Sequence, residues 1–174
     1  MIELILGGAR SGKSALAQER AEASGHYVVF AATARADDPE MAQRISMHKA
    51  TRPDVWLTVE EPLELARVLQ EYDGDRTILV DCLTLWVSNL LMAEESDSLV
   101  FKRERSAFFE AIKTLEADLI LVSNETGMGV IPMGALSRRF VDESGRLHQE
   151  IAALADRVTL TVAGLPMTLK GSAP

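Results

Sequence analysis

Short apolar runs alternate with amphipathic stretches along most of the chain. Each run is five or six residues long and rich in Val, Ile, Leu or Phe; the runs cover 2–6, 27–32, 55–59, 77–81, 118–123 and 157–162. Apolar runs of this length predict strands buried on both faces, as in parallel sheets. The intervening stretches predict helices over 15–23, 41–49, 63–71, 83–92, 98–116 and 135–155. Five or six strands alternating with helices predict a three-layer α/β fold with a mostly parallel central sheet.

Glycine and proline mark where predicted elements stop. Arg52-Pro53 ends the helix over 41–49, because a residue before proline is pushed out of the α region. Ser144-Gly145 predicts an interruption in the last helix. Residues 163–174 contain several glycines and prolines and predict no further element.

The motif with the clearest chemistry follows the first predicted strand. It has the spacing G-x-x-x-x-G-K-S between a strand and a helix, which is the context of a P-loop. Its residues are Gly7, Gly8, Ala9, Arg10, Ser11, Gly12, Lys13 and Ser14. Glycines let backbone N–H groups surround a phosphate, and the following helix N-terminus adds partial positive charge. Lys13 can reach the β- and γ-phosphates and the Ser14 hydroxyl can bind Mg²⁺, so a nucleoside triphosphate site is predicted.

Two other predicted strands end in residues that suit the same site. In open α/β sheets, ligands bind outside the carboxyl ends of the strands, so we expect Ala32, Thr33 and Ala34 near the phosphates. Asp81 ends the run 77–81 and is the expected acidic partner of a P-loop, ordering Mg²⁺ together with Ser14. A plain strand end is the alternative for Asp81, because an acid after an apolar run is common.

Composition limits the partners and the setting. The 174 residues suggest a single domain, 1–174, with 47% hydrophobic residues to form its core. A formal net charge of −8 without a Lys/Arg run argues against nucleic acid and against an anionic membrane surface. No apolar stretch is long enough to cross a bilayer, and no signal sequence precedes the first strand. One cysteine, Cys82, excludes an internal disulfide and fits a cytoplasmic setting.

Further motifs along nearly the whole chain match one family. Besides the P-loop, they are Arg44-Ile45, His48, Arg52-Pro53, Trp56, Thr58, Glu60, Asp81-Cys82-Leu83-Thr84-Leu85-Trp86, Asn89-Leu90, Ser123-Asn124-Glu125, Gly127-Met128-Gly129, Pro132, Phe140-Val141-Asp142, Gly145, Gln149, Ala155-Asp156, Gly164, Pro166 and Lys170-Gly171. The chain resembles the bifunctional adenosylcobinamide kinase / adenosylcobinamide-phosphate guanylyltransferase family of cobalamin biosynthesis. One departure is His148, where the family usually has Asn.

The resemblance implies a RecA-like P-loop fold assembled as a homotrimer. It implies phosphorylation of adenosylcobinamide with ATP or GTP, followed by transfer of GMP from GTP through a guanylylated histidine. By motif match that histidine is His48, and the products are adenosylcobinamide-GDP and pyrophosphate. Beyond the P-loop, the nucleotide-binding residues it implies are Ala32, Thr33, Ala34, Lys49, Arg52, Glu60 and Asp81. Glu60 and Asp81 would accept hydrogen bonds from guanine.

The residues around His48 bear on its role independently of the resemblance. A lone histidine on a predicted helix is usually structural or merely exposed. Arg44, Lys49 and Arg52, however, make this segment basic within an acidic protein, as expected for a segment that approaches a triphosphate. A neutral imidazole is also a competent nucleophile near neutral pH. Both interpretations of His48 remain open at this point.

The remaining aromatic, histidine and cysteine residues have simpler interpretations. Trp56 and Trp86 are predicted to be core or interface aromatics, with stacking on a corrinoid as the alternative. Cys82 follows a buried run and is predicted to be a small core residue. His26 lies beside Gly25 in a predicted turn and is expected on the surface.

Two alternative functions use the same P-loop. The first is a small-molecule kinase that lacks guanylyl transfer. The second is a regulatory GTP-binding protein, although such proteins usually recognise guanine through an Asn-Lys-x-Asp motif, which this sequence lacks.

Overall fold

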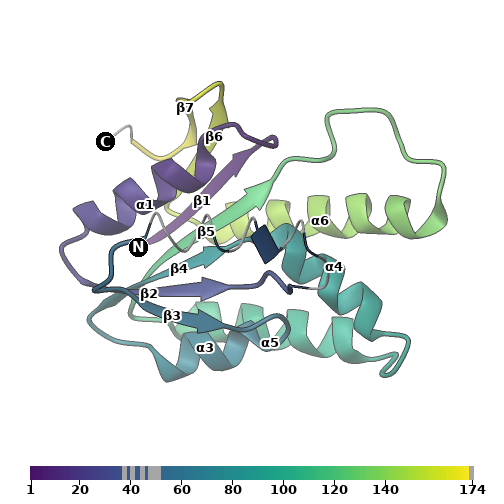
Figure 1. Cartoon of the computed structure of the whole chain (residues 1–174), viewed down its shortest axis with the longest axis horizontal. Helices are drawn as coiled ribbons and strands as arrows, with labels where there is room; N and C mark the ends of the chain where they lie inside the picture. Colours follow the sequence, from purple (N-terminus) through teal and green to yellow (C-terminus); the bar gives the residue numbers. More distant parts are fainter. Residues whose placement is uncertain (37–38, 40–41, 44–45, 47–51, 173–174) are drawn as a thin grey trace.

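One mixed sheet forms the centre of the molecule. The computed structural model describes residues 1–36, 39, 42, 43, 46 and 52–172. Within these residues, seven strands pair in the order β3-β2-β4-β5-β1-β6-β7 (Figure 1). Their bounds are β1 Ile2–Gly7, β2 Tyr27–Ala32, β3 Leu57–Glu60, β4 Arg76–Asp81, β5 Asp118–Asn124, β6 Arg157–Val162 and β7 Leu165–Lys170. All neighbours pair in parallel except β6 and β7, which confirms the predicted mostly parallel α/β fold.

Helices cover both faces of this sheet. Their bounds are α1 Lys13–Ala23, α3 Leu65–Glu71, α4 Leu83–Ala93, α5 Val100–Thr114 and α6 Ala135–Leu154 (Figure 1). The apolar face of α1 packs in one cluster with β1, β2, β4 and β5, and the other four helices pack in a second cluster with the same strands. The predicted helix over 41–49 lies largely outside the described residues.

Side chains along each strand point alternately to the two faces of the sheet, so one continuous apolar run contributes to both clusters. In β1, Leu4 and Leu6 belong to the cluster on the α3–α6 side, while Ile5 belongs to the cluster on the α1 side. Leu79 and Ile120 likewise face α1, between neighbours that face the other way. Successive side chains in a strand point to opposite faces, so a run without polar residues fits a strand that is covered on both sides.

The structure corrects the prediction that no element follows residue 162. Strand β7 adds to the edge of the sheet through a two-residue turn at Ala163 and Gly164, both with positive φ. Two such residues are characteristic of a type I′ hairpin turn. Pro166 is compatible with a strand here because β7 pairs with β6 alone. In the sequence, Pro166 argued against a strand over these residues, because proline is excluded from central strands. The sequence does not show that this strand lies at the edge of the sheet.

The predicted interruption of the last helix was also wrong. Helix α6 continues through Ser144-Gly145 without a break. A glycine inside a helix costs about 1 kcal/mol relative to alanine. Burial of Leu147 and Ile151 one and two turns later outweighs that cost. Strand β3 begins two residues later than predicted, at Leu57.

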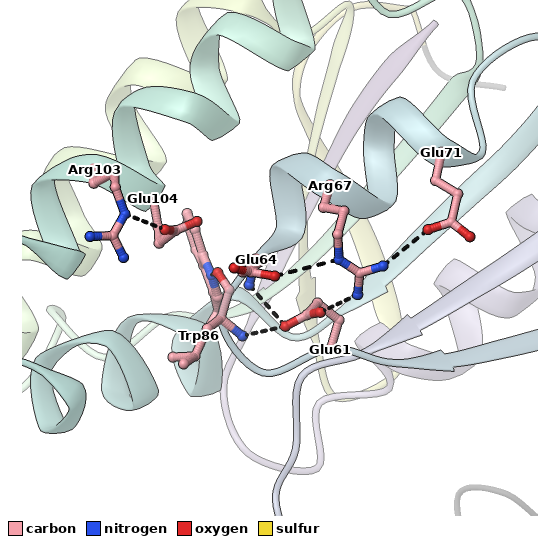
Figure 2. A network of polar contacts seen from close by, with 8 residues as sticks. Glu61, Glu64, Arg67, Glu71, Trp86, Arg103 and Glu104 are labelled. Atoms are coloured by element: carbon pink, nitrogen blue, oxygen red, sulfur yellow. Dashed lines mark hydrogen bonds and ion pairs between the residues drawn. The ribbon is translucent and has the colours of Figure 1, made fainter.

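A buried carboxylate organises the turn before α3. Glu61 accepts hydrogen bonds from the amides of Leu63 at 3.0 Å and Glu64 at 2.9 Å. Its second oxygen accepts one from Arg67 at 2.5 Å, and Figure 2 shows the Arg67 side chain lying between Glu61 and Glu71. Burial alone would raise the pKa of Glu61, but these amide and guanidinium contacts lower it below its usual value. Trp86 donates to the carbonyl of Leu63 at 2.7 Å, which joins this turn to α4.

We predict that Glu61→Ala lowers the free energy of unfolding by about 1–3 kcal/mol, because the partly buried amides of Leu63 and Glu64 lose their acceptor. Glu71→Ala is the matched control, since Glu71 is an exposed partner of the same Arg67. It should change stability by less than about 0.5 kcal/mol. Urea denaturation followed by circular dichroism measures both. Equal losses in the two variants would contradict the role assigned to Glu61.

Candidate nucleotide site at the carboxyl edge of the sheet

The P-loop connects β1 to α1 at the carboxyl edge of the sheet. Its last glycine, Gly12, precedes α1 with a φ of +95°, which favours glycine strongly. Lys13 begins α1 and is 9% exposed, and its ammonium group donates to the carbonyl of Gly8 at 3.1 Å. The Lys13 charge is therefore held inside the loop. The first amides of a helix lack intrahelical partners and attract anions, so the loop suits a phosphate.

The tip of the β6–β7 hairpin supports the P-loop from behind. The amide of Gly164 donates to the carbonyl of Ser11 at 2.8 Å. A Cβ added to Gly12 would lie 3.1 Å from Gly164 Cα, and one added to Gly7 would lie 2.7 Å from the carbonyl oxygen of Thr161. Gly7 and Gly12 are therefore required for close backbone packing as well as for a phosphate turn. The sequence gives no sign of this contact, because no local pattern predicts β7.

Strand β4 places Asp81 at the same edge, and Thr33 ties β2 to it. The Thr33 hydroxyl donates to the carbonyl of Cys82 at 2.7 Å and accepts from the Cys82 amide at 2.9 Å. Its carbonyl accepts from Asn89 at 2.8 Å. Ala32 and Thr33 are buried and Ala34 is partly buried. Ala32 pairs with Asp81 across the two strands, and the Thr33 amide donates to the Asp81 carbonyl at 3.3 Å, so Thr33 holds the strand ends together.

Cys82 is a core residue, as predicted. Burial raises the pKa of its thiol, the adjacent Asp81 raises it further, and the positive charge of Lys13 opposes this rise. The thiol is therefore protonated at neutral pH.

Ser14 and Asp81 provide the oxygen ligands that Mg²⁺ prefers. Ser14 lies in the first turn of α1 and Asp81 ends β4, and both are partly buried. Among the described residues, no group of three or more His, Cys, Asp or Glu residues is arranged to hold a metal by itself. That arrangement fits an ion held partly by phosphate oxygens, as P-loop enzymes hold Mg²⁺.

Arg52 brings a second cationic group to this edge. Its guanidinium carbon lies 3.5 Å from the centre of the Phe30 ring. Burial lowers the pKa of Arg52, while the negative charges of Asp81 and Glu60 oppose that change. Within the described part of the chain, the Nε and NH1 atoms of Arg52 are buried without a hydrogen-bond partner. Buried donors without acceptors are costly, so an anionic ligand would stabilise this arrangement.

A cavity of about 380 Å³ lies next to Arg52. It is lined by Arg52, Pro53, Asp54, Trp56, Thr58 and Glu60. Its volume is within the range of small-ligand sites, and it contains two of the residues predicted to bind nucleotide, Arg52 and Glu60. Trp56 is partly buried at this cavity, whereas Trp86 is buried against Phe108 with ring centres 4.9 Å apart. The core interpretation of Trp86 is therefore confirmed.

His48, Lys49 and Arg44 lie outside the described residues. Their predicted roles therefore stay predictions. His26 is exposed as expected, 3.4 Å from Asp75 and 3.5 Å from Asp118.

The end of β5 forms a polar cluster to which the sequence analysis gave no chemical role. The amide of Glu125 donates to the carbonyl of Gly7 at 3.0 Å, next to the P-loop. Asn124 donates to the Thr84 hydroxyl at 2.8 Å, which connects β5 to the start of α4. Ser123 lies 2.6 Å from Nε2 of His148, a residue of α6 that is 8% exposed. A polar triplet at the end of an apolar run, Ser123-Asn124-Glu125, was the available sequence signal.

The environment of His148 keeps its imidazole neutral. Burial lowers the pKa of His148, and the negative charge of Glu125 opposes this shift only in part. Ser123 shares a hydrogen bond with this neutral ring. Ser123 and His148 therefore form an uncharged hydrogen-bonded pair between β5 and α6.

Comparisons with known proteins agree with this geometry. Residues 3–169 match the sequence model of a family described as cobinamide kinase / cobinamide phosphate guanyltransferase. A Pseudomonas aeruginosa protein, bifunctional adenosylcobalamin biosynthesis protein CobP, is 56% identical over 172 residues, covering 98% of each chain. Proteins named bifunctional adenosylcobalamin biosynthesis protein CobU are 35% identical in Escherichia coli and 38% identical in Salmonella typhimurium, each covering 98% of this chain and 100% of the relative.

Among solved structures, the RadB recombinase aligns with a TM-score of 0.49 and 15% identity, covering 91% of this chain and 73% of RadB. No helix in the described part of the chain has the length and apolar character needed to cross a membrane.

We predict that His148→Asn makes stability less sensitive to acid. The pKa of His148 is lower in the folded protein than in the unfolded chain, so as the pH falls through about 6.5 the unfolded chain takes up this proton before the folded protein does. The free energy of unfolding of the wild type should therefore decrease as the pH is lowered, by at most about 1.4 kcal/mol per pH unit for this one proton.

Denaturation at a series of pH values from about 7.5 to about 5 measures this slope. This range lies on both sides of the ordinary histidine pKa of about 6.5. Ser123→Ala is the control, because it removes the hydrogen bond but leaves the imidazole buried, and it should keep the wild-type slope. An identical slope in His148→Asn and wild type would contradict the prediction.

Proposed function

Because the chain belongs to the cobinamide kinase / cobinamide phosphate guanyltransferase family, we propose that it catalyses both reactions in the synthesis of cobalamin. It phosphorylates adenosylcobinamide with ATP or GTP. It then transfers GMP from GTP to the new phosphate, which gives adenosylcobinamide-GDP and pyrophosphate. The enzyme acts in the cytoplasm as a single domain, 1–174.

The observation that carries this proposal is the convergence of the P-loop, Asp81 and Arg52 at one edge. Lys13 is held within the loop, and Arg52, two of whose donors have no partner among the described residues, lies near Asp81. One cradle of amides and cations can bind the triphosphate in both reactions. Residues 7–14, 32–34, Lys49 and Arg52 bind the nucleotide in this proposal.

In the kinase reaction, Lys13 and the P-loop amides hold the β- and γ-phosphates in line with the acceptor hydroxyl. Positioning and neutralisation of charge supply most of the catalysis in phosphoryl transfer. Mg²⁺, held by Ser14 and Asp81, would neutralise phosphate charge.

In the guanylyl transfer, His48 is the nucleophile. Its neutral ring nitrogen forms a bond to the α-phosphorus of GTP, and the bond to the pyrophosphate oxygen breaks. A phosphate oxygen of the cobinamide phosphate then attacks the same phosphorus, and the histidine nitrogen leaves. Arg52 and Lys49 neutralise the phosphates, and Glu60 and Asp81 accept hydrogen bonds from the N1 and N2 groups of guanine.

We further propose that the enzyme is a homotrimer, and two exposed apolar surfaces support this assembly. The first lies in the segment after β5 and at the start of α6, and consists of Met128, Val130, Ile131, Met133 and Leu136, each more than half exposed. The second lies on β6 and β7, and consists of Val162, Leu165, Met167 and Leu169, also each more than half exposed.

The two surfaces differ and lie at separate places in the molecule (Figure 1). Large exposed apolar patches generally mark interaction surfaces. A contact between two different surfaces is head-to-tail, and such contacts close into rings such as a trimer. The second copy of this chain is therefore the partner that we assign to both surfaces.

We predict that GTP and Mg²⁺ convert the wild type into a covalent adduct heavier by one GMP. His48→Ala should lose the adduct and GMP transfer, by many orders of magnitude, while keeping the kinase activity, because phosphoryl transfer needs no nucleophilic side chain. Intact mass spectrometry detects the adduct, and GTP labelled at the α- or γ-phosphate identifies the group transferred.

His26→Ala, which removes an exposed histidine, is the matched control and should keep both activities. A wild type that phosphorylates adenosylcobinamide but never forms the adduct would indicate a kinase alone. Nucleotide hydrolysis that depends on a protein partner, without either activity, would indicate a regulatory GTP-binding protein.

We predict that Val130→Asp with Met133→Asp converts the trimer to monomer at micromolar concentration, because two charges would be buried in an apolar contact. Met92→Asp, at an exposed apolar residue of α4 outside both surfaces, should remain trimeric. Sedimentation velocity measures the three proteins. A monomeric wild type would exclude the assembly, and a trimeric double variant would exclude this surface.

A further inference from the structure

The proposed kinase reaction requires a group that accepts the proton of the substrate hydroxyl, and the site described above does not assign one. In kinases this group is typically a carboxylate placed beside the γ-phosphate. The order of the strands decides which carboxylates are close enough. Neighbouring strands lie about 4.8 Å apart. The number of strands between a residue at the carboxyl edge and β1 therefore gives its approximate distance from the P-loop.

Glu125 is the described carboxylate next to the P-loop. It follows β5, which lies between β4 and β1, and its amide is hydrogen-bonded to Gly7, the first residue of the P-loop. Glu60 ends β3, four strands from β1, or roughly 19 Å at the usual spacing. Asp81 ends β4 and is assigned to Mg²⁺ together with Ser14.

One carboxylate oxygen of Glu125 is held by a hydrogen bond, and the other can contact a substrate. Its Oε1 accepts a hydrogen bond from the amide of Gly127 at 2.5 Å. In the part of the chain that the structure describes, its other oxygen makes no hydrogen bond. The carboxylate is partly buried, so it is accessible to a substrate at this edge.

The neighbour of Glu125 on α6 is an uncharged imidazole. His148 is held by Ser123 at 2.6 Å, and burial lowers the pKa of this imidazole. The ring is therefore neutral and does not form an ion pair that would compete for the carboxylate. A carboxylate without a cationic partner is the better proton acceptor.

We propose that Glu125 is the general base of the kinase reaction, which makes this inference dependent on the proposed function. Its free oxygen accepts the proton of the adenosylcobinamide hydroxyl as that oxygen forms a bond to the γ-phosphorus. The bond between the γ-phosphorus and the β–γ bridging oxygen breaks, and the nucleoside diphosphate leaves with the electron pair. Glu125 then releases the proton to solvent.

Glu125→Gln tests the proposal with little structural change, because the amide oxygen of glutamine can still accept from Gly127. The kcat for phosphorylation of adenosylcobinamide should fall by about 10²–10⁴-fold, the usual contribution of a general base, and KM for ATP should change little. When cobinamide phosphate is supplied directly, GMP transfer and the GMP–protein adduct should remain at wild-type levels. Glu110→Gln, at an exposed residue of α5, is the matched control and should keep both activities.

Glu125→Asp retains a carboxylate and should recover part of the lost kinase activity, which a purely structural role for the side chain would not predict. Thermal unfolding of each variant checks that the fold is intact. Kinase activity in Glu125→Gln above a tenth of wild type would overturn the proposal, as would an equal loss of GMP transfer. Failure of the wild type to phosphorylate adenosylcobinamide would instead overturn the proposed function, and it would be seen before any variant is made.

Discussion

The parallel pairing of β1 between β5 and β6 is the constraint on which the candidate site depends. Parallel strands end at a common edge, so the P-loop after β1, Glu125 after β5 and Asp81 after β4 are neighbours although they are far apart in sequence. A slip of β1 by one residue would move Ile5 to the α3–α6 cluster and Leu4 and Leu6 to the α1 cluster, and neither cluster would keep its close packing. The same core that stabilises the fold therefore sets the register of the site.

The P-loop is held by backbone packing rather than by its own sequence alone. Gly7 and Gly12 approach Thr161 and Gly164 too closely for a side chain, and Gly164 donates to Ser11. This contact places the tip of the last hairpin behind the phosphate cradle. An edge strand whose six residues are all exposed thus contributes to the site through its turn, while its apolar side chains lie on the surface.

Buried polar side chains connect the strand ends, and among the described residues they leave two donors of Arg52 without a partner. The Thr33 hydroxyl donates to the Cys82 carbonyl, and Asn89 donates to the Thr33 carbonyl. Glu61 accepts hydrogen bonds from the Glu64 amide and from Arg67. Their hydrogen bonds are satisfied within the protein, which makes the edge rigid. Arg52 differs, because two of its buried donors have no partner within the described residues. A guanidinium that has available N–H donors and is held in rigid surroundings suits phosphate binding, because little reorganisation is required when the phosphate arrives.

The sequence by itself determined strands β1 to β6, most helices and the P-loop motif, because apolar periodicity and glycine spacing are local properties. Only the tertiary structure decided that β7 exists, since Pro166 is tolerated only where one side of a strand is unpaired. It also decided that Thr33 bonds to Cys82, that His148 is buried against Ser123 and that Glu125 adjoins Gly7. These contacts join residues 25 to 118 positions apart, and no local pattern encodes them: strand order and the packing of α6 bring them together.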